Sequence, residues 1–140
     1  MSTDKLNFIA KKLCEKPKGI LAADESTNTI KKRFDSINVE SNFEMRRAYR
    51  ELLFKTPNLK NFISGVILFD ETIRQEDSEK TSLAKYLLDN DIIPGIKVDT
   101  GAIHLEKNSQ EKLTEGLDGL GERLEEYKSL GASFTKWRAI

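Results

Sequence analysis

The chain has 140 residues, a length that suits one ordinary domain. Its 23 lysines and arginines balance 23 aspartates and glutamates, and this zero formal net charge argues against a nucleic-acid binder. The single cysteine excludes an intrachain disulfide, and no apolar stretch suits a signal peptide or a membrane span, so we expect a soluble cytoplasmic protein.

Short apolar runs alternate with amphipathic stretches along the chain. Apolar residues at helical spacing from Leu6 to Leu13 predict a leading helix, which Pro17 ends. A capping box formed by Ser41 and Glu44 predicts the start of another helix. We expect strands over residues 19–24, 63–69, 93–99 and 133–140, further helices over about 28–36, 82–90 and 117–130, and a long loop over 100–114.

The order of these elements indicates the fold class. A leading helix is followed by a βαβαβαβ pattern, and its strands are almost continuously apolar. Apolar strands that alternate with helices are typical of a parallel α/β sheet covered on both faces. Four βα units fit a small open sheet or one half of a (β/α)8 barrel, and composition and periodicity leave both possibilities open.

Charged residues stand at the ends of these apolar strands. Asp24 closes the first strand, Lys97 lies near the end of the third, and Lys136 and Arg138 lie in the fourth. In a barrel the carboxyl ends of parallel strands form the active-site face, so these four side chains would meet at one rim. Three cations around one carboxylate suit an anionic, phosphorylated substrate.

A structural interpretation of the same residues stays open. Charged side chains in a parallel sheet must be paired or face a ligand. Asp24 with Lys136, and Lys97 with Asp99, could be ion pairs that serve the fold alone. We favour a functional site because all of these residues reach the same rim.

Other polar residues give weaker signals. His104 is the single histidine and lies in a polar segment, where we expect a surface residue. Arg33 and Arg46 belong to basic helix faces that we expect to be solvated, although Arg33 could reach a phosphate. The sequence has no Walker loop, no Gly-x-Gly-x-x-Gly and no metal-ligand spacing, so we expect no metal and no cofactor.

Four segments, in order, resemble the motifs of class I fructose-bisphosphate aldolases. They are the run GILAADEST at 19–27, GVILF at 65–69 with Glu71 and Thr72, GIKVDTG at 95–101, and EGLDGL at 115–120 leading to the Lys-Trp-Arg motif at 136–138.

This resemblance implies a (β/α)8 TIM barrel, of which residues 1–140 would be the N-terminal half, with the leading helix and about the first four strands. It also implies reversible cleavage of fructose 1,6-bisphosphate to dihydroxyacetone phosphate and glyceraldehyde 3-phosphate, a step of glycolysis. A lysine Schiff base would serve as electron sink without a metal. A single histidine is too few for the metal-dependent class of aldolase. The full-length family member would be a homo-oligomer, expected to be a tetramer.

The resemblance also assigns roles to single residues. Asp24 would handle protons on the substrate hydroxyl during carbon–carbon cleavage. Lys136 would depress the pKa of the Schiff-base lysine and assist proton transfer. The substrate-binding residues would be Lys97, Arg138, Ser26, Thr29, Arg33 and Arg46.

The sequence departs from the familiar animal form at three positions. Asn28 stands for a usual glycine, Asp70 for a usual histidine and Thr100 for a usual lysine. None of these departures removes a matched catalytic group.

The Schiff-base lysine of the family lies on a later strand than this chain contains. We therefore expect the chain alone to be inactive and to aggregate, dimerise or stay molten, because its inner face lacks an opposing layer. Two alternatives remain. One is a non-catalytic relic that binds sugar phosphates or contributes to an assembly, and the other is a different α/β enzyme on a half-barrel or open sheet. Labelling of Lys136 as the Schiff-base lysine would favour that enzyme, although the Lys-Trp-Arg context argues against this role.

Overall fold

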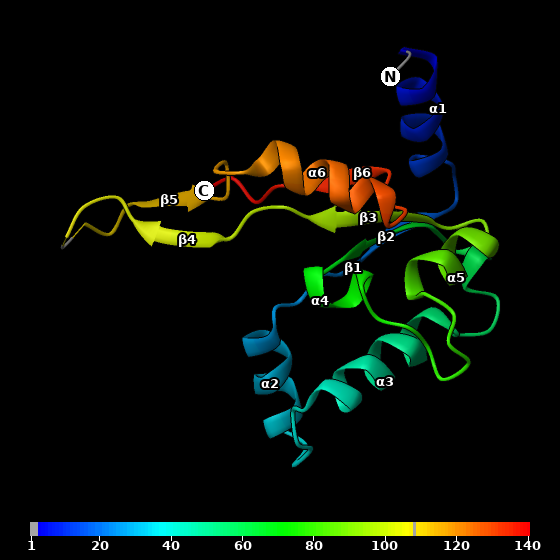
Figure 1. Ribbon diagram of the computed structural model, residues 1–140, viewed down its shortest axis with the longest axis horizontal. Coiled ribbons are helices and arrows are strands. Elements are labelled where there is room, and N and C mark those ends of the chain that lie inside the picture. The colour runs from blue at the N-terminus through cyan, green and yellow to red at the C-terminus, as the bar shows by residue number, and fades with distance from the viewer. Residues whose placement is uncertain (1–2, 108) are drawn as a thin grey trace.

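A computed structural model describes residues 3–107 and 109–140 of the chain (Figure 1). Four parallel strands form one sheet in the order β1-β2-β3-β6, and β4 and β5 form a separate antiparallel pair. The strands are β1 (Gly19–Ala23), β2 (Ile63–Leu68), β3 (Ile93–Lys97), β4 (Gly101–His104), β5 (Lys112–Glu115) and β6 (Phe134–Lys136). The helices are α1 (Thr3–Leu13), α2 (Thr27–Asp35), α3 (Phe43–Phe54), α4 (Asp70–Ile73), α5 (Leu83–Asp89) and α6 (Leu120–Ser129), with a 3-10 turn, η1 (Leu59–Asn61).

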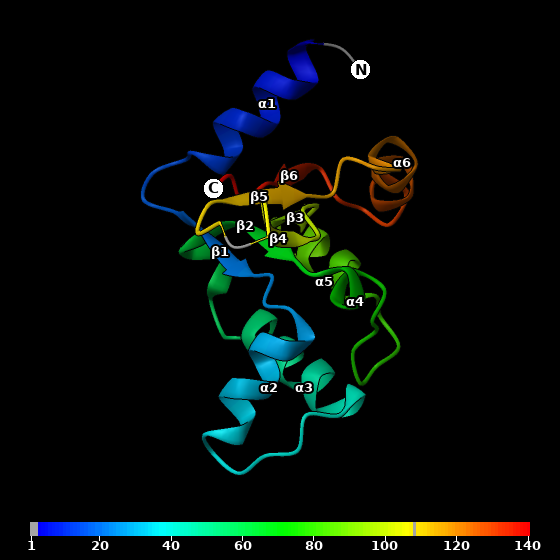
Figure 2. The ribbon, with the colours of Figure 1, turned by 90° about the vertical axis from the view of Figure 1, so that its left-hand side faces the viewer.

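The core lies between the sheet and the helices that follow each strand. Figure 2 shows α2 and α3 on one side of the sheet and α1 on the other. Val66 and Leu68 of β2 and Ile96 of β3 are fully buried against Leu83 and Leu87 of α5. Burying such aliphatic side chains contributes roughly 1.5–3 kcal/mol each, which explains why these strands are apolar without alternation.

Glycines in β2 and β3 make room for an aromatic ring of the neighbouring strand. Gly95 pairs with Phe134 in the parallel ladder, and a Cβ at Gly95 would overlap the Phe134 ring. A Cβ at Gly65 would meet both Leu13 of α1 and the same ring. The glycines of two motif segments therefore let the sheet close tightly over Phe134.

The predicted α/β order is confirmed, but three details were wrong. Residues 100–114 are not a loop: β4 and β5 form a hairpin that extends away from the sheet (Figure 1). The cap of α3 is not Ser41 but Asn42, whose side chain accepts the Met45 N–H at 2.9 Å. The fourth strand of the sheet ends at Lys136, so Arg138 lies just beyond it.

None of the helices in the described ranges is long and apolar enough to cross a membrane.

Candidate active site

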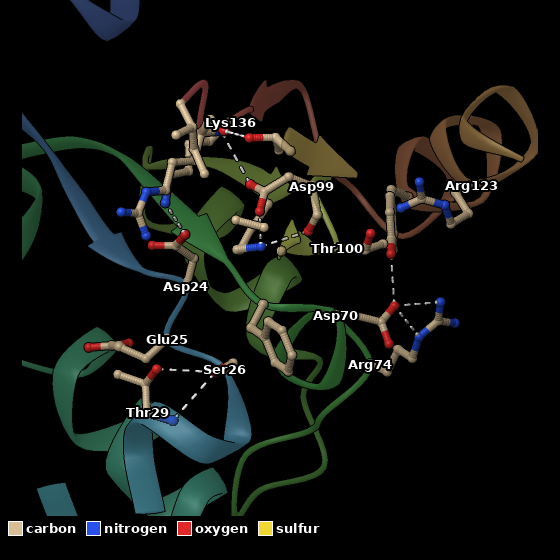
Figure 3. A pocket seen from close by; sticks show the side chains of 18 of the residues that line it. Asp24, Glu25, Ser26, Thr29, Asp70, Arg74, Asp99, Thr100, Arg123 and Lys136 are labelled. Atoms are coloured by element: carbon tan, nitrogen blue, oxygen red, sulfur yellow. Dashed lines mark hydrogen bonds and ion pairs between the residues drawn. The ribbon is translucent and has the colours of Figure 1, made fainter. Parts of the chain in front are cut away.

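A cavity of about 740 Å³ opens at the carboxyl ends of the parallel strands. Figure 3 shows Asp24, Asp99 and Lys136 around one part of it, and Asp70 with Arg74 around another. Of the residues predicted for the site, those that line this cavity are Asp24, Ser26, Thr29, Lys97, Lys136 and Arg138.

Asp24 and Lys136 meet across the concave side of the sheet. The Lys136 ammonium donates to Asp24 Oδ2 at 2.5 Å, and Asp24 is 8% exposed. Their strands, β1 and β6, are the two edges of the four-stranded sheet, which would stand about 14 Å apart if the sheet were flat. The long Lys136 side chain and a sheet that curves, as in a barrel, together bring these two groups into contact.

Lys97 and Asp99 form the second pair of the cavity. The Lys97 ammonium donates to Asp99 Oδ1 at 2.5 Å and to the Asp99 carbonyl at 2.6 Å. The second carboxylate oxygen of Asp99 accepts the backbone N–H of Arg138 at 3.2 Å. Burial works to raise the pKa of Asp99, but these hydrogen bonds and the charges of Lys97 and Lys136 hold that pKa below its usual value.

Both pairs that the structural interpretation proposed are thus present, and both face the cavity. These two ion pairs do not prevent ligand binding at the cavity. The Arg138 side chain, which also lines it, makes no ion pair within the described ranges and can therefore contact a ligand. An arginine fork without a carboxylate partner, beside two lysines, is suited to phosphate oxygens.

Ser26 and Thr29 lie where α2 begins. Ser26 is the N-cap: its side chain accepts the Thr29 N–H at 3.4 Å, and the two hydroxyl oxygens lie 3.1 Å apart. The first turn of a helix carries unpaired N–H groups and a partial positive charge. This end of α2 therefore presents backbone N–H groups and two hydroxyls at the edge of the cavity.

Arg33 and Arg46 do not line the cavity. Arg33 is paired with Glu25 and donates to the Tyr49 hydroxyl at 3.3 Å, and the charge of Glu25 raises the pKa of Arg33. Arg46 forms a two-point pair with Glu71, at 2.8 and 2.7 Å, and those hydrogen bonds raise its pKa. A role for either arginine in substrate binding would require these pairs to open.

Arg50 is a residue that sequence reasoning missed. Its side chain is 1% exposed, lies 2.8 Å from the Glu25 carboxylate and donates to the Glu25 carbonyl at 3.0 Å. Burial lowers the pKa of Arg50, opposed by the charge of Glu25. The one available signal was its place four residues before Phe54, on the buried face of α3. Glu25 itself lines the cavity, so Arg50 fixes part of the cavity wall.

A second charged cluster forms the opposite wall. Arg74 donates to Asp70 at 2.9 Å and to Glu126 at 2.5 Å, and the Tyr127 hydroxyl donates to Asp70 at 3.0 Å (Figure 3). Burial and this hydrogen bond raise the pKa of Tyr127. Asp70, which departs from the animal pattern, is therefore the acceptor that joins α4 to α6.

Comparison with known proteins identifies the family. The family model described as glycolytic, fructose-bisphosphate aldolase class-I, matches residues 5–140. The chain belongs to this family. It is 56% identical, over its whole length, to a probable fructose-bisphosphate aldolase class 1 of Xanthomonas campestris, and 51% identical over 137 residues to a fructose-bisphosphate aldolase of Plasmodium falciparum.

Solved structures agree with the family assignment. The co-crystal structure of fructose-bisphosphate aldolase from Plasmodium falciparum with TRAP and a small-molecule inhibitor superposes with a TM-score of 0.93, at 51% identity, over 97% of this chain and 39% of that one. The chain likewise spans 42% of the Xanthomonas campestris relative. The α/β fold expected from the sequence is confirmed, and the four-stranded sheet corresponds to part of the aldolase TIM barrel.

Proposed function

We propose that this chain supplies the substrate-binding part of a class I fructose-bisphosphate aldolase. The reaction is reversible cleavage of fructose 1,6-bisphosphate through a Schiff base, without a metal, in cytoplasmic glycolysis and in a homotetramer. The observation that carries the proposal is the Asp24–Lys136 pair, 2.5 Å apart, at a cavity that Lys97 and Arg138 also line. The family assignment supports the same reaction.

Substrate binding follows from the charges around the cavity. The Arg138 guanidinium and the Lys97 ammonium would contact one phosphate, and the N-terminus of α2 with Ser26 and Thr29 would contact the other. A bisphosphate spans both ends of the cavity, whereas a single phosphate fills only one.

Proton handling follows from the central pair. The Asp24 carboxylate would accept the proton of the substrate hydroxyl as the carbon–carbon bond breaks, while the electron pair moves to a protonated Schiff base on a lysine outside this chain. The positive charge of Lys136 would hold that lysine amine neutral enough to attack the carbonyl, because like charges lower the pKa of an ammonium.

A chimeric aldolase tests this function. This chain would replace the matching segment of the Xanthomonas campestris relative, which then supplies the remainder of the barrel. We expect the chimera to cleave fructose 1,6-bisphosphate. Borohydride reduction in the presence of dihydroxyacetone phosphate should label a lysine outside this chain.

Each other outcome points to a specific alternative. Binding of fructose 1,6-bisphosphate without cleavage would favour the non-catalytic relic. Borohydride labelling of Lys136 would favour a different enzyme in which Lys136 is the nucleophile.

A further inference from the structure

Asp99 is a buried carboxylate whose two oxygens both accept hydrogen bonds from other residues of the chain. Its side chain is 3% exposed, and its two oxygens accept separately from the Lys97 ammonium and the Arg138 N–H. Resting on the proposed function, we propose that Asp99 is a positioning residue that sets the geometry of both substrate-binding cations. It would act through Lys97 and Arg138 rather than touch the substrate.

The effect on Lys97 follows from counting donors. An ammonium has three N–H donors, and two from Lys97 go to the Asp99 carboxylate and the Asp99 carbonyl. One donor therefore remains, and its direction is fixed by the other two. A flexible lysine would otherwise lose substantial rotamer freedom each time it bound a ligand.

The effect on Arg138 acts through its backbone. Arg138 lies beyond the end of β6, so no strand ladder holds it. Its N–H donates to Asp99 Oδ2 at 3.2 Å, and its carbonyl accepts from the Thr114 hydroxyl at 2.7 Å. These two bonds link the Arg138 backbone to Asp99, just beyond the end of β3, and to β5 of the hairpin, and so fix the point from which the guanidinium extends.

Asp99 is itself held in place by the base of the hairpin. Gly116 has φ +128°, and a Cβ there would lie 2.9 Å from the Val98 carbonyl and 3.1 Å from Asp99 Cα. Arg123 of α6 donates to the carbonyls of Val98 at 3.1 Å and Gly116 at 2.5 Å. Close packing and this two-point clamp leave Asp99 little room to shift.

Positioning and simple electrostatics predict opposite effects of removing the Asp99 charge. Asp99→Asn makes the cavity more positive, so Coulomb attraction alone would strengthen the binding of a phosphate. A positioning role predicts weaker binding, because Lys97 and the Arg138 backbone lose their fixed partner. The sign of the change in affinity therefore separates the two.

The experiment uses the chimeric aldolase with two probes, fructose 1,6-bisphosphate and inorganic phosphate. Steady-state kinetics would give the affinity for the bisphosphate and calorimetry that for phosphate, and hydrogen exchange by mass spectrometry would follow the peptide that contains the Arg138 amide. Asp99→Asn keeps the shape and loses the charge, whereas Asp99→Glu keeps the charge and displaces it. The control Glu126→Gln neutralises a cavity carboxylate that has no bond to Lys97 or Arg138.

We expect both Asp99 variants to bind fructose 1,6-bisphosphate about 10-fold more weakly and to exchange the Arg138 amide faster, since small misplacements of binding groups are costly. Glu126→Gln should bind at least as tightly as the unchanged chain. Unchanged or tighter binding by Asp99→Asn, unchanged exchange at Arg138, or loss of folding in both Asp99 variants would overturn the proposal. A chimera with the unchanged chain that binds neither probe contradicts the proposed function instead, and the exchange data then decide the role of Asp99.

Discussion

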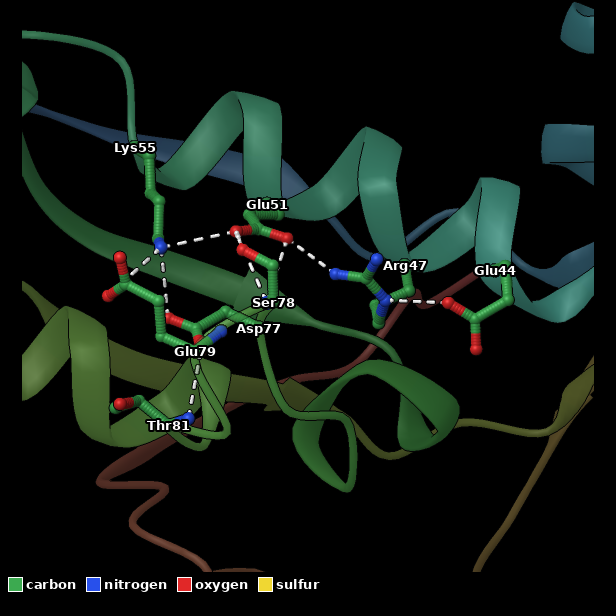
Figure 4. Close-up of polar contacts among 8 residues, drawn as sticks. All are labelled: Glu44, Arg47, Glu51, Lys55, Asp77, Ser78, Glu79 and Thr81. Carbon is green, nitrogen blue, oxygen red and sulfur yellow. Dashed lines mark hydrogen bonds and ion pairs between the residues drawn. The ribbon is translucent and has the colours of Figure 1, made fainter.

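Two networks of paired charged side chains differ in what lies beside them. The pocket network consists of Asp24, Lys97, Asp99 and Lys136 at the strand ends. The outer network joins α3 to the segment after α4 and consists of Arg47, Glu51, Lys55, Asp77 and Ser78 (Figure 4).

The difference lies in the number of carboxylates around each lysine. Lys55 has three carboxylates around its ammonium, Glu51 at 3.1 Å, Asp77 at 3.1 Å and the more distant Glu79 at 3.8 Å. In the part of the chain that the structure describes, Lys136 donates to Asp24 alone, and its side chain lines the cavity. An ammonium with one carboxylate partner and a cavity beside it is therefore the feature that distinguishes the pocket network from the outer one.

The sharpest way to break this comparison is to remove one lysine from each network. In the chimeric aldolase, Lys136→Met should reduce cleavage about 10²–10⁴-fold, the usual loss when a group that assists proton transfer is removed. Lys55→Met should lower stability and leave kcat within about 2-fold, because its ammonium lies in the outer network alone. Steady-state kinetics with thermal unfolding would check both.

An equal loss of kcat in the two variants would contradict the distinction. Lys85→Met serves as a control, because Lys85 forms an exposed pair with Asp89 and surface pairs contribute about 0–1 kcal/mol.

The second largest effect is expected from substitution of Arg50, which shares features with both networks. It is buried like a structural residue, yet its partner Glu25 lines the cavity. Arg50→Met leaves the Glu25 carboxylate without its buried partner, and breaking a buried pair costs about 3–5 kcal/mol. Urea denaturation would measure this loss.

The double variant Arg50→Met with Glu25→Gln should recover much of that stability, since it removes the carboxylate charge that has lost its buried partner and keeps only the exposed Arg33. A double variant as unstable as the single one would show that packing of the arginine, rather than its charge, holds this wall.

The pocket network could be predicted from the sequence, whereas the buried arginine that fixes part of the cavity wall could not. Asp24, Lys97 and Lys136 were predicted to share a rim because the carboxyl ends of parallel strands meet there, and periodicity alone located those ends. Which of several arginines on α3 turns inward was not visible, since Arg46, Arg47 and Arg50 are alike in type.

Two further features depend on contacts distant in the chain. The contact between Asp24 and Lys136, which follow or end the two edge strands β1 and β6, depends on the shape of the whole sheet, and no local pattern encodes it. The β4–β5 hairpin has mostly exposed residues and no apolar alternation, so its pairing had no periodic signal.

The third prediction concerns Asp77, which organises the outer network. Its side chain is 1% exposed, and Oδ1 accepts the N–H groups of Glu79 at 2.9 Å and Thr81 at 2.8 Å. Asp77→Asn keeps that acceptor but loses the charge that faces Lys55, so we expect a loss of about 1–3 kcal/mol in the free energy of unfolding. Affinity for fructose 1,6-bisphosphate should not change. Weaker ligand binding by a folded Asp77→Asn chain would show that the outer network reaches the cavity.

The smallest effect should be the pH dependence that Glu51 gives to the outer network. The hydrogen bond from the Ser78 hydroxyl, followed by those from Lys55 and Arg47, lowers the pKa of Glu51 from 4.5 to about 2. A depressed folded pKa contributes stability that is present above the unfolded value and is lost as pH falls through the folded one. The free energy of unfolding should therefore be higher for the unchanged chain than for Glu51→Gln at pH 7, and this difference should shrink as the pH falls from 4.5 towards 2. A gap that stays constant over this window would mean that Glu51 stabilises the chain by packing rather than by charge.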